Sequence, residues 1–152
     1  MFVLEVNNQT QIKVDKKLLE GIIQICQKVL KIRKNQEISL AFVTPAVIKK
    51  MNLAYRGKNE VTDVLSFAGE NNSTLGEIII CLARAKQQAL AASRVRGQAK
   101  QSDRAMKSEV AKLLIHGYLH LLGHDHKTLS DARTMEQLER RIMFQNSDLK
   151  IH

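Results

Sequence analysis

Apolar residues in the first part of the chain follow two different periods, which predict two strands separated by a helix. Residues 2–6 form a short apolar and β-branched run, and residues 37–43 alternate between faces, so each run predicts a strand. Between them, apolar residues recur at helical spacing from Leu18 to Val29, after Asp15, which is suited to capping a helix. This order predicts two parallel strands joined by a right-handed crossover.

The pattern continues with a second helix and a hairpin. Thr44 and Pro45 predict a helix start, because a hydroxyl N-cap is followed by proline at the first helical position. We expect this helix to end at Arg56. Residues 64–68 and 77–81 predict two strands, and the turn-forming residues between them predict that the pair is an antiparallel hairpin.

Helical spacing dominates the second half of the chain. Residues 82–95 predict a helix that Gly97 ends, and Ser102 or Asp103 is expected to cap the next helix. A last helix is expected to begin at a Ser130 cap. The long helix in the middle of this half carries an apolar stripe, formed by Val110, Leu113, Leu114, Gly117 and Leu121.

These elements predict one α/β domain over residues 1–152, a length sufficient to bury a substantial core. We expect a mixed sheet of about four strands packed with five or so helices. The first two strands should be parallel, and the hairpin at 64–81 antiparallel. No repeat, linker or low-complexity segment divides the chain.

Charge and cysteine content narrow the class of protein. Lys and Arg outnumber Asp and Glu by 24 to 15, a balance that suits a polyanionic partner. Seven basic residues and one acid fall within 84–107, which fits either a phosphate-tracking surface or a solvated helix face. Cys26 and Cys81 each lie in an apolar context, which favours reduced thiols and the cytoplasm. The sequence shows neither a signal peptide nor a membrane span.

The strongest candidate chemistry lies in residues 116–126, where three histidines have the spacing His-x3-His-x2-Gly-x2-His. His116 and His120 should lie one turn apart on one helical face, and Gly123 should end the helix so that the chain brings back His126. Three neutral imidazoles leave the fourth position of a tetrahedral Zn²⁺ open, as in catalytic zinc sites. Ni²⁺ or another divalent transition metal would also suit these ligands.

This spacing is the zincin-like ligand pattern of metzincin proteases with one change, since Gly117 replaces the glutamate that acts as their general base. The metal cage is therefore present without the protease's proton acceptor. A phosphate ester needs that acceptor less than an amide does, because its main demand is charge stabilisation in the transition state. Met135 falls where metzincins place a methionine turn, but its helical spacing favours core packing.

Three segments resemble recurring segments of the YbeY family, bacterial endoribonucleases that mature ribosomal RNA. Residues 116–126 resemble its H-G-x-L-H-L-x-G-x-D-H signature. Residues 52–58, followed by 62–67, resemble a second block, and residues 75–81 are similar to a Leu-Gly-Asp-Ile-x-Ile-Cys strand. The segments keep the family's order and spacing, so the resemblance covers about residues 35–145.

The resemblance implies a zinc-dependent hydrolase, a single-strand-specific endoribonuclease acting in 16S rRNA 3′ end maturation, ribosome assembly and quality control. It implies that His116, His120 and His126 bind the metal and that these residues and Arg56 are catalytic. The guanidinium of Arg56 matches phosphate oxygens in a bidentate way, although a surface ion pair is its alternative. Implied partners are ribosomal RNA in the small subunit, a small-subunit ribosomal protein and the GTPase Era, with no membrane.

Several points stay open at the level of sequence. Asp125 is able to orient a ligand imidazole or to cap the turn before His126. His124, where the family often has tyrosine, is a competing ligand that the spacing disfavours. Besides the nuclease, a metallopeptidase and a non-catalytic assembly factor with structural zinc remain alternatives. Because aromatic residues are few, we expect RNA recognition to be mostly electrostatic.

Overall fold

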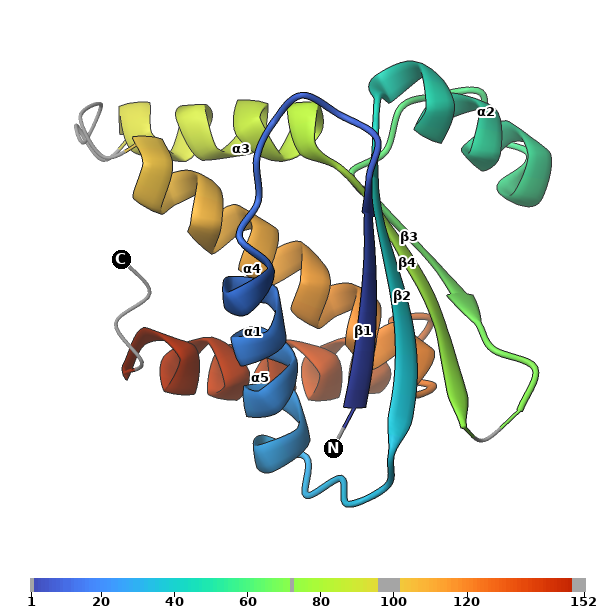
Figure 1. Cartoon of the computed structure of the whole chain (residues 1–152), viewed down its shortest axis with the longest axis vertical. Helices are drawn as coiled ribbons and strands as arrows, with labels where there is room; N and C mark the ends of the chain where they lie inside the picture. The colour runs from blue at the N-terminus through green and yellow to red at the C-terminus, as the bar shows by residue number, and fades with distance from the viewer. Residues whose placement is uncertain (1, 72, 96–101, 149–152) are drawn as a thin grey trace.

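A computed structural model describes residues 2–71, 73–95 and 102–148 (Figure 1). The predicted helix end at Gly97 lies outside these residues. The elements are, in chain order, β1 (Phe2–Asn8), α1 (Lys16–Val29), β2 (Gln36–Val43), α2 (Pro45–Arg56), β3 (Val64–Ala68), β4 (Thr74–Cys81), α3 (Leu82–Val95), α4 (Ser102–Leu121) and α5 (Leu129–Asp148).

The strands form one mixed sheet in the order β1-β2-β4-β3. Strands β1 and β2 are parallel, β2 and β4 are parallel, and β3 runs antiparallel to β4. The predicted α/β class, parallel first pair and hairpin are therefore confirmed. Strand β4 begins at Thr74 rather than at the predicted Glu77. Its first residues follow the turn directly and already pair with β2. Strand β3 is left at the edge of the sheet.

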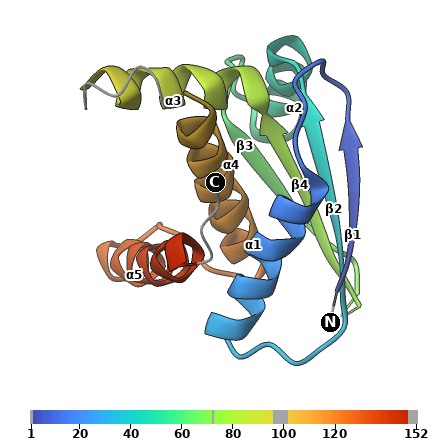
Figure 2. The ribbon, with the colours of Figure 1, turned by 60° about the vertical axis from the view of Figure 1, so that its left-hand side comes forward.

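The sheet is covered on both faces. Helices α1, α3, α4 and α5 lie on one side and α2 on the other (Figure 1), and α1 and α4 lie between the sheet and α5 (Figure 2). Alternate residues of β4 serve the two faces: Ile78 and Ile80 belong to the large core, Ile79 and Cys81 to the smaller core under α2. The opposite placement of α2 and α4 brings both helices to the edge strand β3.

The helix starts of the first half follow local capping chemistry. The Asp15 side chain accepts a hydrogen bond from the Lys17 N–H at 3.0 Å, as predicted. Thr44 occupies the N-cap position of α2, but its side chain forms no capping hydrogen bond. Pro45 at the first helical position is therefore the stronger local determinant of this start.

The predicted cap of the last helix is wrong, because Ser130 lies inside α5. The residues directly before α4 and the Ser102 side chain lie outside the described part of the chain, so the cap expected at Ser102 or Asp103 stays a prediction. The cap of α5 is Thr128, whose hydroxyl oxygen accepts a hydrogen bond from the Asp131 N–H at 3.1 Å. The hydroxyls of Thr128 and Ser130 both suit this role. The helix starts after Thr128 because the earlier start adds backbone hydrogen bonds to the helix. None of the helices in the described ranges is long and apolar enough to span a bilayer.

Candidate metal centre

Helix α4 holds two of the histidines in place because most of its second half, from Val110 to Leu121, is buried. The predicted apolar stripe is buried, and so is Tyr118, whose hydroxyl donates a hydrogen bond to the side chain of Gln36. His116 and His120 lie one turn apart at the border of this buried surface and are half-buried. The packing of α4 on the sheet therefore fixes where both imidazoles can lie.

The turn after α4 supplies the third imidazole. Gly123 has a φ of 94°, and its N–H donates to the carbonyl of His120 at 3.0 Å. The N–H of His124 donates to the carbonyl of Leu119 at 3.0 Å, which completes a Schellman turn. Glycine suits this position because it enters a positive φ without a Cβ clash. The turn brings His126 beside the other two rings, as predicted.

The three imidazoles face a common point. One nitrogen from each of His116, His120 and His126 lies within 4.8 Å of the others. The Nε2 atoms of His116 and His120 are 3.0 Å apart. Two nitrogens bound to one tetrahedral zinc at about 2.0–2.1 Å would be separated by about 3.3 Å. The donor set and its spacing therefore fit a zinc ion with only small adjustments.

The surroundings of His120 favour its neutral imidazole. Burial lowers the pKa of His120 below its ordinary value, and the neighbouring imidazoles of His116 and His126 lower it further. A lowered pKa favours the neutral ring at neutral pH, and the neutral ring is the form that donates a lone pair to a metal. The surroundings of His120 therefore favour the form of this ring that binds a metal over its protonated form.

Glu139, on α5, is a site residue that the sequence analysis missed. Its Oε1 lies 2.6 Å from Nδ1 of His116, close enough to accept the Nδ1–H. This bond leaves the Nε2 lone pair free to face the other imidazoles and fixes the orientation of the ring. Asp125 instead accepts a hydrogen bond from the Lys127 N–H, so its side chain stabilises the turn. In the sequence, Glu139 is marked only by its place next to the helically spaced apolar residues Met135, Leu138 and Ile142.

Replacing Glu139 by glutamine is expected to weaken zinc binding about 10-fold, the lower end of the effect of losing an outer partner of a metal ligand. Glutamine can still accept the Nδ1–H, but it lacks the charge that raises the basicity of His116. The measurement is competition for zinc against a chelator of known affinity. Glu136→Gln is the matched control, because Glu136 is on the same helix in an exposed ion pair with Arg140. Equal affinities for wild type and Glu139→Gln would contradict this role.

Arg56 shares a hollow with the histidines. It is the last residue of α2, which Gly57 ends in the left-handed conformation at φ 70°. Asn52, buried on the same helix, donates a hydrogen bond to the carbonyl of Glu60 at 3.0 Å and so holds the following loop. The hollow has a volume of about 430 Å³ and follows β3, with lining residues Tyr55, Arg56, Thr62, Asp63, Val64, Leu65, Ser66, Phe67, His116, His120 and His126. The structure thus brings all the predicted site residues together, while their catalytic roles stay predictions.

Gly117 has a packing role in addition to its place in the motif. A Cβ at this position would lie 2.8 Å from Cγ2 of Ile78 and 3.1 Å from Oγ of Ser66. The Ser66 hydroxyl donates a hydrogen bond to the Gly117 carbonyl at 3.2 Å, which joins α4 to β3. A glutamate at this position, as metzincin proteases carry it, would therefore require the side chain of Ile78 to shift.

A second hollow adjoins the first at His116. It has a volume of about 460 Å³ and lies against α4 and α5, with Lys112, Leu113, Arg140 and Met143 in its lining. The two hollows share Asp63, Val64 and His116. His116 therefore lies where the two hollows adjoin, whereas His120 and His126 line only the first of them.

The described basic residues of the segment 84–107 do not line the metal hollow. Arg96 and Lys100 are outside the described residues, and Lys107 forms an ion pair with Asp103 at 3.4 Å. The remaining members, Arg84, Lys86, Arg94 and Arg104, are exposed on α3 and the first turn of α4. None of these four lines the metal hollow. A phosphate-tracking role for this segment stays a prediction.

Known proteins resemble this chain over nearly its full length. The sequence profile of a family described as "Endoribonuclease YbeY" matches residues 5–147. A protein named Endoribonuclease YbeY from Syntrophomonas wolfei is 33% identical, with 94% of this chain and 96% of the relative covered. One of the same name from Finegoldia magna is 37% identical, with 88% and 86% covered. A solution structure of a Thermotoga maritima protein shares the fold, with a TM-score of 0.60 at 23% identity over 96% of this chain and 89% of that one.

Proposed function

The chain belongs to the YbeY family of endoribonucleases, which act in ribosomal RNA processing, and on this basis we propose that it is a zinc-dependent endoribonuclease specific for single-stranded RNA. The observation that carries the proposal is the shared hollow of Arg56 and the three imidazoles. A cationic group facing a metal site suits a phosphodiester, whose hydrolysis depends on stabilising negative charge.

Each side chain has a distinct task in this proposal. His116, His120 and His126 would hold the zinc, and Glu139 would keep His116 in the binding tautomer. Zinc held by three imidazoles supplies Lewis acidity and lowers the pKa of a bound water to about 7. The guanidinium of Arg56 would bind two oxygens of the scissile phosphate through its fork of N–H donors.

The size of the hollow supports a single-stranded substrate. Its volume of about 430 Å³ is in the range of ordinary ligand sites, about 300–1,000 Å³, and suits a nucleotide or two. The second hollow adjoins it at Asp63, Val64 and His116, which would give a flexible strand room to continue. A duplex holds its phosphates on a rigid A-form surface, whereas a single strand can bend into a depression.

The proposal extends to a biological setting. We propose the 3′ end of 16S rRNA as substrate, within the small ribosomal subunit, with a small-subunit ribosomal protein and the GTPase Era as partners. A formal net charge of +9 supports association with RNA. Cys26 and Cys81 are buried free thiols, and burial raises the pKa of Cys26 to about 12, which fits a protein that works in the reducing cytoplasm.

Removal of the metal tests the proposal. The purified protein should cleave a single-stranded oligoribonucleotide, lose this activity when zinc is chelated, and regain it when zinc is returned. A perfect duplex of the same sequence should be cleaved far more slowly. The measurement is the initial rate of fragment release on denaturing gels. Full activity in metal-free protein would rule out zinc dependence, and equal rates on both RNAs would rule out single-strand specificity.

One observation favours a second candidate, a metallopeptidase. The hollow follows β3, an edge strand, and an extended peptide is able to pair with such an edge. Against it, Gly117 stands where metzincins carry the glutamate that serves as their proton acceptor, and the tight packing there disfavours a side chain. Chelator-sensitive release of peptides from casein would favour this alternative over the nuclease.

A further inference from the structure

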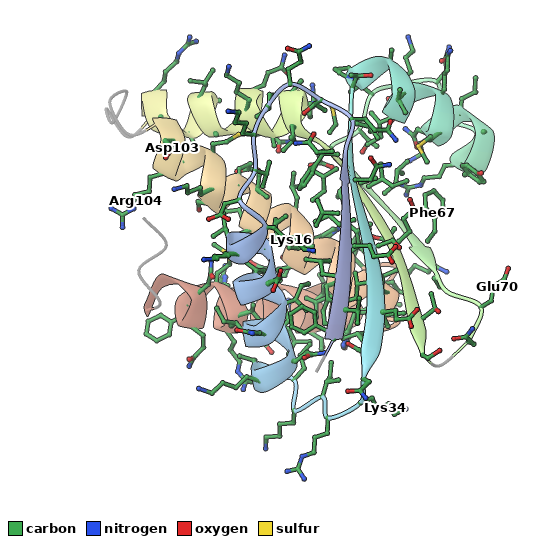
Figure 3. All side chains as sticks on the ribbon, viewed as in Figure 1. Lys16, Lys34, Phe67, Glu70, Asp103 and Arg104 are labelled. Atoms are coloured by element: carbon green, nitrogen blue, oxygen red, sulfur yellow. The ribbon has the colours of Figure 1, made fainter. Side chains whose placement is uncertain are left out.

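Two aromatic rings lie together in the metal hollow. Tyr55, on the last turn of α2, and Phe67, on β3, have ring centroids 5.0 Å apart and an interplanar angle of 61°. Both line the hollow that contains Arg56 and the three histidines. Figure 3 places Phe67 beside β3, on the side of the sheet where α2 lies. These rings come from different elements, so their pairing could not be read from either segment alone.

The exposure of Tyr55 is not explained by packing. Phe67 is half-buried against the small core under α2, whereas Tyr55 is 69% exposed and belongs to neither core cluster. Both rings are nevertheless held in place. Phe67 is paired in register with Glu77 across the hairpin, and its edge-to-face contact restrains the Tyr55 ring. A restrained ring that keeps a large exposed surface loses little freedom when a flat ligand covers it.

Arg56, the residue after Tyr55, indicates which flat ligand would cover the Tyr55 ring. Arg56 follows it directly and lines the same hollow, so a phosphate bound by Arg56 would bring its own nucleotide close to the aromatic pair. Every nucleobase has a flat face, and proteins bind single strands by stacking bases on aromatic side chains. A strand in the hollow would thus meet a cation for its phosphate and an aromatic surface for its base, in adjacent residues.

Resting on the proposed function, we propose that Tyr55, supported by Phe67, is a stacking site for the nucleobase next to the phosphate held by Arg56. The site adds a base-dependent component to the mostly electrostatic recognition expected from the small number of aromatic residues. It tolerates different bases, because stacking does not read their hydrogen-bonding edges. It also favours single strands, since a paired base is already stacked inside its duplex.

Binding of matched oligonucleotides tests the proposal without requiring cleavage. The probe is a single-stranded 2′-O-methyl oligoribonucleotide of roughly ten nucleotides, within the usual site size, and a version of it without bases. Tyr55→Ala should raise the Kd of the base-containing strand between about 5- and 150-fold, the cost of one lost stack. Tyr55→Phe should bind it within about 2-fold of wild type, because stacking needs the ring and not the hydroxyl. The strand without bases should bind all three proteins equally.

A matched control and a spectroscopic signature separate stacking from a structural role. Phe144→Ala removes a side chain that is 68% exposed and lies in a different hollow, with Val29 and Arg141, so it should leave binding unchanged. The chain has two tyrosines and no tryptophan, and Tyr118 is fully buried. Quenching of tyrosine fluorescence by the base-containing strand should therefore report Tyr55, and should vanish in Tyr55→Ala.

The outcomes distinguish this inference from the proposed function. Wild-type affinity in Tyr55→Ala, or an equal loss of affinity for the strand without bases, would overturn the stacking site even if the wild-type protein cleaves RNA. Base-dependent binding that is lost in Tyr55→Ala and kept in Tyr55→Phe would support it, even for a wild-type protein that fails to cleave.

Discussion

Replacing His120 by alanine is expected to abolish zinc binding and RNA cleavage together while leaving the protein folded. His120 lies between the other two ligands in the chain, and its Nε2 is 3.0 Å from that of His116. With two imidazoles left, zinc affinity should fall by more than the roughly 100-fold that loss of an outer hydrogen-bond partner can cause. The measurements are zinc stoichiometry, RNA cleavage rate and far-ultraviolet circular dichroism on the same preparation.

His124→Ala is the matched control for this prediction. His124 is four residues further along the chain, in the same turn, but the described metal-binding cluster is formed by the other three histidines. Its contribution to the Schellman turn is a backbone N–H, which alanine keeps. His124→Ala should therefore bind zinc and cleave RNA as wild type does. Cleavage by His120→Ala at the wild-type rate would mean that a contaminating nuclease is responsible and that the assignment fails.

The circular dichroism of His120→Ala also distinguishes a catalytic metal from a structural one. The large core is formed by residues of the sheet and of α1, α3, α4 and α5, and the three histidines are not among them. Removing the metal should therefore leave secondary structure in place. Loss of secondary structure together with the metal would instead support the assembly-factor alternative, in which zinc holds the fold together.

Replacing Arg56 by alanine is expected to lower kcat by about 1,000-fold, the lower end of the effect of an arginine that stabilises a phosphoryl transition state. Arg56 lies in the hollow but is not a metal ligand, so zinc binding should not change. Arg56→Lys should recover only a small part of the rate, because a lysine ammonium keeps the charge but lacks the planar fork. The measurement is kcat and KM for RNA cleavage at saturating zinc.

Lys58→Ala is the control for Arg56. Lys58 lies in the loop directly after α2 and is exposed, but it is not among the residues that line the hollow. Its removal should change KM slightly through lost long-range attraction and should leave kcat unchanged. If Arg56→Ala instead raises KM and leaves kcat intact, this guanidinium binds the substrate without acting on the transition state.

Local patterns were sufficient to predict most of the fold. The alternating apolar residues of β2 and the helically spaced apolar residues of α1 face one core. Their burial therefore appears as a regular period in the local sequence. The His-x3-His spacing and the glycine stop likewise depend on residues within one turn of each other. For this reason the ligand cluster could be read from residues 116–126 alone.

Contacts between distant segments could not be read in this way. Glu139 reaches His116 across the α4–α5 interface, and Tyr55 meets Phe67 across the interface of α2 and β3. Neither pair leaves a periodic signal. The cap of α5 was misplaced for a different reason, since Thr128 and Ser130 offer the same chemistry two residues apart.

Gly117 illustrates how structure changes the interpretation of a motif. From the sequence, it was the position where a protease glutamate is missing. In the structure it is also the point where α4 approaches Ile78 of β4 so closely that a side chain would have to displace it. The absence of the glutamate is thus tied to helix packing as well as to chemistry.

The most direct test of the zinc site is a crystal structure of the protein grown with zinc, with diffraction recorded on both sides of the zinc absorption edge. We predict a single strong anomalous peak bonded to one nitrogen each of His116, His120 and His126 at about 2.0–2.1 Å, with Arg56 facing it across the hollow. A zinc-loaded crystal with no peak at these three rings, or with zinc held by other side chains, would contradict this prediction.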